Sequence, residues 1–243
     1  MRPRRLGGIV MLLVLSGCAQ PSLNDADAAD AVKGIPGVLG ARSDCSNPLG
    51  GEPDCTLVVD VLPDLSAAKI RKVVDKSWPS LVDDVYNLRI VSDGVSVSMN
   101  VGRREVNEIG VDTLLTMRGL EHVTEGSIEI RGSGVNRVEA VTDSFDAGLE
   151  IATALRSDEF LDVNVTGDAL QLATANGFPT AEFAFARQVP KAVKGVVSKV
   201  RIEPGSVIVY CTGEAAQQEA KKVVPGLPGY ARAGLVEVFQ DAP

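Results

Sequence analysis

The chain has 243 residues, of which 45% are hydrophobic and 23% charged, a mixture typical of globular proteins that excludes wholesale disorder. Its formal net charge of −8 disfavours nucleic acid as a partner, because nucleic-acid binding requires a basic surface. The single histidine leaves little material for a zinc site or a catalytic triad.

The N-terminus has the pattern of an export signal. Arg2, Arg4 and Arg5 precede an apolar run of about ten residues that ends in small residues. This run is too short to span a bilayer, which takes about 20 residues. Residues 1–17 contain three arginines and no acid, so the chain from residue 18 onward has a net charge of −11.

The segment Leu15-Ser16-Gly17-Cys18 resembles the lipobox of bacterial lipoproteins, and the resemblance covers residues 1–18. It implies that residues 1–17 are a cleaved signal peptide. It also implies that Cys18 is the lipid attachment site, with acyl chains that insert into the bilayer.

Under this resemblance, residues 18–24 form a short lipidated tether. We expect the protein to be anchored by its lipid at the extracytoplasmic face of the cell membrane. The acidic charge of the remaining chain disfavours a second, electrostatic contact with anionic lipid.

The other cysteines agree with an exported protein. Cys45 and Cys55 bracket a turn-rich stretch, and in an oxidising compartment they predict a disulfide. Closing this short loop would contribute about 3 kcal/mol in the chain-entropy model. The alternatives are two free thiols or a metal site, although no histidine or second cysteine pair lies nearby. Cys211 follows a strand-like run and is expected to be a buried, inert thiol.

Four hairpins are predicted along the chain. Residues 88–99 alternate between apolar and polar side chains around a turn at Asp93-Gly94. A similar pattern covers residues 161–173. Two further hairpins are expected to turn at residues 125–127 and 204–206.

Helical patterns separate the hairpins. In one series, each helix is expected to begin at a capping residue. Asp64 or Ser66 caps a helix that stops ahead of Pro79, and Asp143 or Ser144 caps a second helix. Thr212 caps a third helix, which stops at Pro225. A second series comprises three segments, at residues 25–33, 104–118 and 180–189, the last ending at Pro190.

The order helix, strand, strand, helix, strand, strand recurs about three times. Unit 1 covers residues 25–101 and carries the disulfide loop, unit 2 covers 103–175, and unit 3 covers 178–243 without a clear final strand. Residues 56–130 have the βαββαβ order of a split βαβ or ferredoxin-like fold. We therefore expect an α+β fold with antiparallel-rich sheets, helices on one face, and about three repeated αββαβ(β) units. The alternative is one irregular domain.

Few residues point to catalysis. His122, the only imidazole, stands at the start of a predicted strand with no nucleophile motif in the chain. No Walker A sequence occurs, and Arg137 stands where a dinucleotide fingerprint requires its third glycine. The acidic pairs at residues 83–84 and 158–159 are read as solvated turn residues. We expect no enzyme, and no catalytic, cofactor-binding or metal-binding residues.

Three hypotheses of function follow. The first is a non-enzymatic protein-interaction or envelope-assembly module, partnered by an envelope protein. The second is a carrier or sensor of a small apolar ligand such as lipid, which would need a large apolar pocket. The third and weakest is an envelope hydrolase that uses paired carboxylates.

Overall fold

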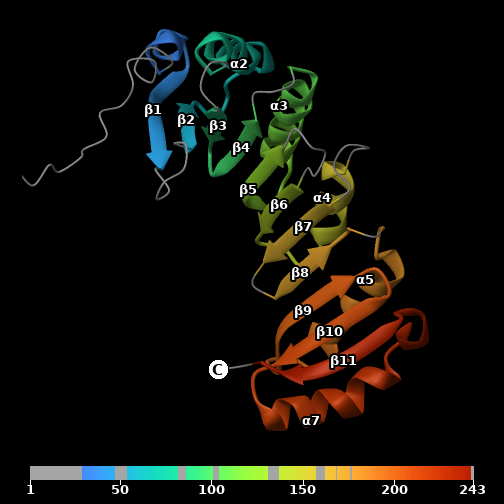
Figure 1. Cartoon of the computed structure of the whole chain (residues 1–243). Helices are drawn as coiled ribbons and strands as arrows, with labels where there is room; N and C mark the ends of the chain where they lie inside the picture. Colours follow the sequence, from blue (N-terminus) through green and yellow to red (C-terminus); the bar gives the residue numbers. More distant parts are fainter. Residues whose placement is uncertain are drawn as a thin grey trace, which may run out of the picture.

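The computed structural model describes residues 29–46, 54–81, 86–100, 104–130, 137–156, 162–167, 169–175 and 177–241. They form one sheet of 11 strands whose spatial order is the order of the sequence (Figure 1). The strands are β1 (Val38–Ser46), β2 (Asp54–Val61), β3 (Tyr86–Ser92), β4 (Val95–Asn100), β5 (Val123–Ile130), β6 (Arg137–Thr142), β7 (Asp162–Gly167), β8 (Leu170–Ala173), β9 (Val197–Glu203), β10 (Ser206–Cys211) and β11 (Leu235–Gln240). The helices are α2 (Ala67–Leu81), α3 (Arg104–Gly119), α4 (Gly148–Leu155), α5 (Thr180–Ala186), α6 (Val189–Ala192) and α7 (Glu214–Val223), with short 3₁₀ turns η1 (Val224–Gly226) and η2 (Tyr230–Arg232).

The repeating element is a ββα unit. Two antiparallel strands form a hairpin, a helix follows, and the next hairpin begins with a strand parallel to the last one. The first strands of successive hairpins start at residues 38, 86, 123, 162 and 197. Beyond the first unit, the period is therefore close to half of the 75 residues or so expected from the sequence.

The predicted fold class is wrong. A ferredoxin-like split βαβ places another strand between its two parallel strands, whereas each parallel pair here, such as β2 with β3, lies side by side. Antiparallel and parallel pairings alternate along the sheet, so the sheet is mixed rather than antiparallel-rich. The segments expected as three units, 25–101, 103–175 and 178–243, all contribute strands to this single sheet.

Local turn chemistry explains the hairpins that were predicted correctly. Asp93 and Gly94 have φ of 50° and 77°, the conformation of a two-residue turn between antiparallel strands. The turn at residues 204–206 likewise joins β9 to β10. The turn expected at residues 125–127 is wrong, because β5 runs straight through them. Gly126 serves packing instead, since a Cβ atom there would overlap the side chain of Met117 on α3.

Several helix ends and the last strand also differ from the prediction. Helix α2 continues through Pro79 to Leu81, because a proline inside a helix removes one backbone hydrogen bond and can bend the helix without ending it. Pro190 lies in the first turn of α6, a position that tolerates proline, and does not terminate a helix. The N-cap of α7 is Gly213 rather than Thr212. The third unit does have a final strand, β11, which pairs in parallel with β10.

The core lies between the sheet and its helices. On β4, Val95, Val97 and Met99 are buried, and they belong to the same apolar cluster as Leu114 and Met117 of α3. Complete burial of such a side chain contributes roughly 1.5–3 kcal/mol.

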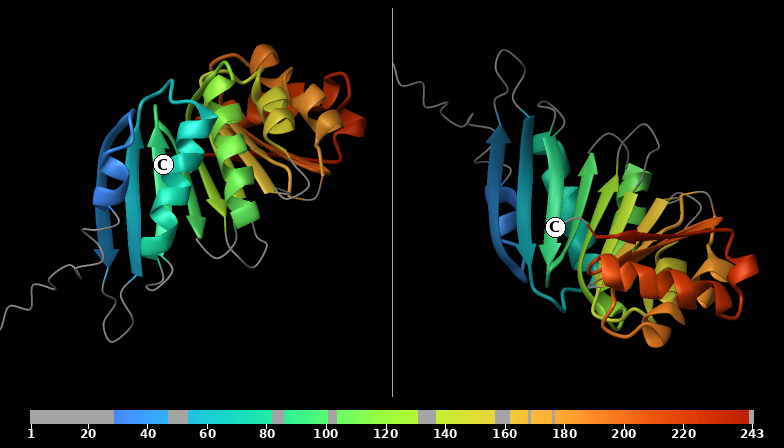
Figure 2. Two further views of the ribbon diagram at one scale, coloured as in Figure 1. Left: turned by 90° about the horizontal axis from the view of Figure 1, so that it is seen from above. Right: turned by 90° about the horizontal axis from the view of Figure 1, so that it is seen from below.

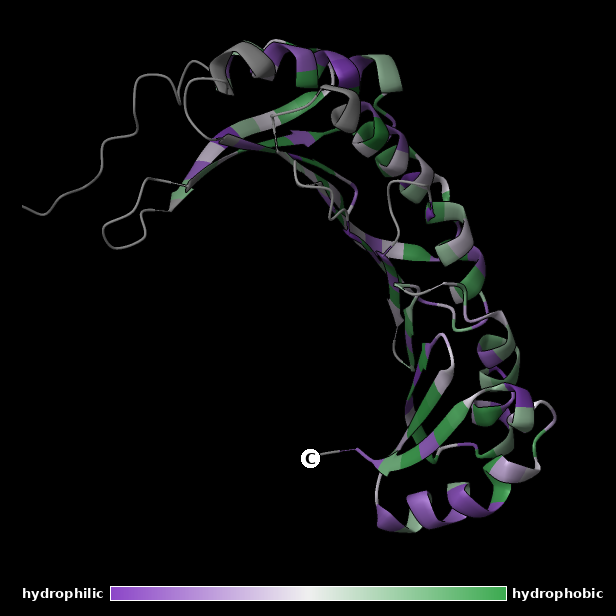
Figure 3. Cartoon of the chain, turned by 45° about the vertical axis from the view of Figure 1, so that its right-hand side comes forward, coloured by the Kyte–Doolittle hydropathy of each residue, from purple (hydrophilic) through white to green (hydrophobic). Residues whose placement is uncertain are grey.

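The sheet twists and curves along its length, as the two views of Figure 2 show. The helices lie along the outer side of the curve, and the other face of the sheet lines its inner side (Figure 3). No described helix combines the length and apolar character needed to cross a bilayer.

Candidate functional site

The inner face of the sheet carries the polar side chains of the strands. In β6, burial alternates strictly: Val138 and Ala140 are buried toward the helices, while Arg137, Glu139 and Val141 are exposed on the other side. This alternation follows from the period of two in an extended strand. We call the side away from the helices the open face.

Strand register aligns the open-face residues in rows that cross the sheet. One row runs from β3 to β7 through Val91, Ser96, Ser127, Glu139 and Asn164. The next row runs from β5 to β8 through Glu125, Val141, Thr166 and Gln171. Residues from six strands thus form one continuous surface that is polar except at Val91 and Val141.

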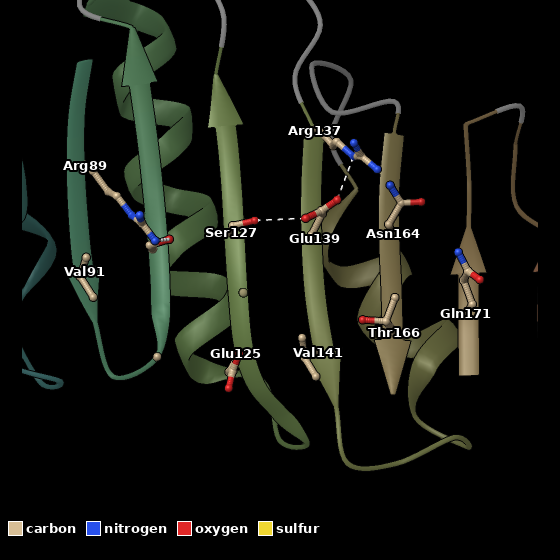
Figure 4. Close-up of a pocket in the computed structure, with 13 residues that line it drawn as sticks. Arg89, Val91, Glu125, Ser127, Arg137, Glu139, Val141, Asn164, Thr166 and Gln171 are labelled. Carbon is tan, nitrogen blue, oxygen red and sulfur yellow. Dashed lines mark hydrogen bonds and ion pairs between the residues drawn. The ribbon is translucent and has the colours of Figure 1, made fainter. Parts of the chain in front are cut away.

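The middle of the open face is hollowed into a shallow groove of about 460 Å³ across β3 to β8 (Figure 4). Its lining includes two arginines, two glutamates and the side chains of Asn164, Thr166 and Gln171. Only Val91 and Val141 contribute apolar side chains. The charged and amide groups of this lining suit a polar partner.

Glu139 is fixed at the centre of the groove by its neighbours. The Nε of Arg137 lies 3.0 Å from one carboxylate oxygen, and the hydroxyl of Ser127 donates to the other oxygen at 3.5 Å (Figure 4). All three residues come from the central strands β5 and β6. The negative charge of Glu139 is thereby matched before any partner binds.

Arg89 differs from Arg137 because its charge is not matched. Its guanidinium donates a hydrogen bond of 3.2 Å to the hydroxyl of Ser96, and no carboxylate of the described residues pairs with it. Asn164 and Gln171 likewise form no side-chain hydrogen bond with another described residue. A cation and two amides in one groove are ready to bind carboxylate, carbonyl and amide groups.

The single histidine lies outside the groove. His122 is in the turn between α3 and β5, with a φ of 70°, and its Nδ1 lies 2.8 Å from a carboxylate oxygen of Asp143. No hydroxyl or thiol of a described residue bonds to this imidazole. Within the described ranges, no cluster of three or more potential metal-ligating residues occurs.

The cysteines lie away from the groove. The predicted disulfide between Cys45 and Cys55 is present, and it joins directly opposite positions of β1 and β2. Cys211 is fully buried on β10, and this burial raises the pKa of its thiol, in keeping with the predicted inert residue. Cys18 and the lipobox lie outside the described residues, as do the acidic pairs at 83–84 and 158–159.

Sequence reasoning missed the groove residues. The alternation in Arg137–Thr142 was a usable signal, since it separates a polar from an apolar face. The rows across the sheet had no such signal, because they depend on pairing between strands that no local pattern encodes.

No family model matches the chain, and no curated protein matches it. Among solved structures, the chain resembles the C-terminal domain of CdsD, the structural protein of the type III secretion system of Chlamydia trachomatis. The identity is 12%, the match covers 92% of this chain and 100% of that chain, and the TM-score is 0.20. A likeness of this strength establishes neither a shared fold nor a shared function.

Proposed function

We propose that this protein is a non-enzymatic interaction module of the cell envelope that binds a protein partner on its open face. The observation that carries the proposal is the groove, where Arg89, Asn164 and Gln171 have hydrogen-bonding capacity that the described residues leave unused. Polar groups left without partners at a concave surface are available for recognition.

A protein suits the groove better than other classes of partner. Both signs of charge and neutral amides meet there, which matches the mixed chemistry of a polypeptide surface. Nucleic acid would require a basic surface, whereas the chain carries a net charge of −8. An extended stretch of partner chain could cross several strands and meet Arg89 and Gln171 at the two sides of the groove.

The anchor is a separate part of the proposal. The lipobox resemblance at residues 15–18 supports lipidation at Cys18 and a position on the extracytoplasmic face of the cell membrane. The disulfide between Cys45 and Cys55 supports an oxidising compartment. The mass of the N-terminal peptide of the membrane-extracted protein tests this part, and an unmodified Cys18 would refute it.

Site-specific photo-cross-linking tests the open face. A photoreactive amino acid replaces Thr166 in the groove or, as a control, exposed Lys222 on α7. We expect a defined protein adduct from position 166, none from position 222, and loss of the adduct when Arg89→Glu is added. Circular dichroism of each variant checks that the fold is retained. No adduct at position 166, or the same adduct from both positions, would refute binding at the open face.

A further inference from the structure

Helix α2 is the most basic of the described helices. It carries four cationic side chains and one acidic side chain, a net charge of +3, whereas the whole chain has a net charge of −8. Its neighbour α3 carries two cations and three acids, and no other described helix has a net charge above +1. Basic charge is therefore gathered on one element of an acidic protein.

Three of the four cations of α2 form a stripe. Lys69, Lys72 and Lys76 are exposed, and their i, i+3, i+7 spacing places them on one side of the helix over a length of about 10 Å. None of their ammonium groups forms an ion pair or hydrogen bond with a described residue. Asp75 lies roughly 90° around the helix from their mean direction, because the helix has about 3.6 residues per turn. We call these three residues the lysine stripe.

The lysine stripe lies on the side of α2 that is turned away from α3. Nη2 of Arg71 lies 2.6 Å from Oδ1 of Asp112 on α3, so the side of α2 that carries Arg71 faces α3. The mean direction of the stripe is roughly 130° away from Arg71 around the helix. The stripe is thus directed toward the N-terminal end of the sheet, where the helical turn of residues 29–33 lies beside α2 (Figure 1, Figure 2).

The expected lipid anchor joins the chain at this same end. Cys18 precedes Ala29, the first described residue, by 11 residues, and an extended chain of that length spans at most about 40 Å. Lipidation at Cys18 would keep the N-terminal end of the sheet within that distance of the bilayer. A weak attraction between α2 and the membrane would then act as an intramolecular contact.

Local charge, rather than net charge, governs such a contact. The Debye length at physiological ionic strength is about 8 Å, so an anionic bilayer attracts or repels mainly the side chains nearest to it. The axes of packed helices lie about 8–10 Å apart, so the acids of α3 are largely screened from a bilayer that touches the stripe. The acidic net charge of the chain, which by itself predicts repulsion, therefore does not prevent attraction at α2.

We propose that the lysine stripe docks on the head groups of anionic phospholipids in the bilayer that holds the anchor. This inference rests on the anchor of the proposed function, and it extends a point attachment to an oriented contact. Each lysine at an anionic surface strengthens binding about fivefold, so the three lysines together contribute about a hundredfold. The contact would orient the sheet so that its later strands, toward β11, extend away from the bilayer.

Contact quenching in reconstituted vesicles tests the docking. The full chain, extracted from its own membranes, carries a fluorophore at Ala68→Cys on α2 or, as a control, at Gln218→Cys on α7, both at exposed positions. The vesicles contain a lipid with a spin-labelled head group, in phosphatidylcholine alone or mixed with phosphatidylglycerol. We expect quenching at residue 68 only in the phosphatidylglycerol vesicles and none at residue 218. The quenching should be lost in 1 M salt, where the Debye length falls to about 3 Å.

Charge reversal separates the lysine stripe from the net charge. The variant Lys69→Glu/Lys72→Glu/Lys76→Glu should abolish the quenching at residue 68. A control variant makes the same change in net charge at exposed lysines toward the other end of the sheet and should leave the quenching unchanged: Lys194→Glu/Lys221→Glu/Lys222→Glu. Circular dichroism of both variants checks that the fold is retained.

Flotation with phosphatidylcholine vesicles measures the anchor separately. A chain that fails to float with them would refute lipidation at Cys18, and the stripe would then be judged by flotation with phosphatidylglycerol vesicles. Equal quenching in both kinds of vesicle, quenching that persists in the stripe variant, or a chain that binds anionic vesicles no better than neutral ones would overturn the proposal. A photo-cross-link from residue 68 to an acidic protein, in place of quenching, would also overturn it and assign the stripe to that protein.

Discussion

Gly234, the residue immediately before β11, offers a sharp test of how the last strand is held. Its φ is 68°, and a Cβ atom there would lie 2.7 Å from the carbonyl carbon of Gly205, in the turn between β9 and β10. The amide of Leu235 donates to the carbonyl oxygen of Gly205 at 2.9 Å, so the close approach is part of the pairing between β10 and β11. The variant Gly234→Ala should therefore disturb the start of β11.

The magnitude has two parts. A left-handed conformation costs alanine about 1 kcal/mol relative to glycine, and overlap with a backbone that cannot move freely costs about 1–3 kcal/mol. The expected loss of unfolding free energy is about 2–4 kcal/mol, which lowers the melting temperature of a chain of this size by about 5–15 °C.

Thermal unfolding followed by circular dichroism measures this loss. Gly226→Ala is the matched control, because a Cβ atom at Gly226 meets nothing within 4 Å and its φ is not in the left-handed region. A melting temperature of Gly234→Ala within about 2 °C of that control would show that the tight contact with Gly205 does not constrain the strand.

Three further predictions concern stability. Leu114 is fully buried in the core, so Leu114→Ala should lower the free energy of unfolding by about 2–5 kcal/mol in denaturant titrations, and a loss below 1 kcal/mol would contradict tight packing of α3 on the sheet. Replacing both Cys45 and Cys55 by alanine should cost about 3 kcal/mol in the same assay, and an unchanged free energy of unfolding would contradict a stabilising role of the disulfide. The hydrogen bond from Arg187 lowers the pKa of Asp146, so this carboxylate stabilises the fold above the unfolded-state pKa near 3.8, and the contribution disappears as the pH falls through the lower, folded-state pKa. Asp146→Asn should then lose less than about 1 kcal/mol at pH 7, because the side chain is half exposed, and the difference from the unaltered chain should shrink as the pH falls below 3.8; a difference that grows on acidification would show the opposite sign.

The sequence predicted elements whose cause is local. The turn at Asp93-Gly94 was predictable because two residues with positive φ suffice to define it. The turn predicted at Gly126 was wrong because the sequence alone does not distinguish a glycine in a turn from a glycine that leaves room for a neighbouring side chain, here that of Met117. The strand Leu235–Gln240 was missed although its apolar residues are consistent with one, because nothing after it suggested a hairpin.

The arrangement of the strands was not predictable in this way. The order βαββαβ along the chain is compatible with a ferredoxin-like sheet, in which another strand separates the two parallel strands, and with a sheet whose strands lie in sequence order. The choice between these two sheets depends on contacts between distant residues. The groove depends on that choice, since Arg89 and Gln171 belong to strands that meet one surface only when β3 to β8 lie in sequence order. The disulfide needed no such knowledge, because cysteine spacing and an expected oxidising compartment sufficed.

The sequential order of the sheet also bears on how the chain acquires its structure during synthesis. Every strand finds its neighbours among the segments just before and just after it, so each pairing is closed by a hairpin or across the helical connection to the next strand. In a chain that emerges N-terminus first, each new ββα unit could fold against the unit that precedes it. Each strand from β2 to β10 pairs with the strands immediately before and after it in the sequence, so the sheet could fold in one direction, from β1 to β11.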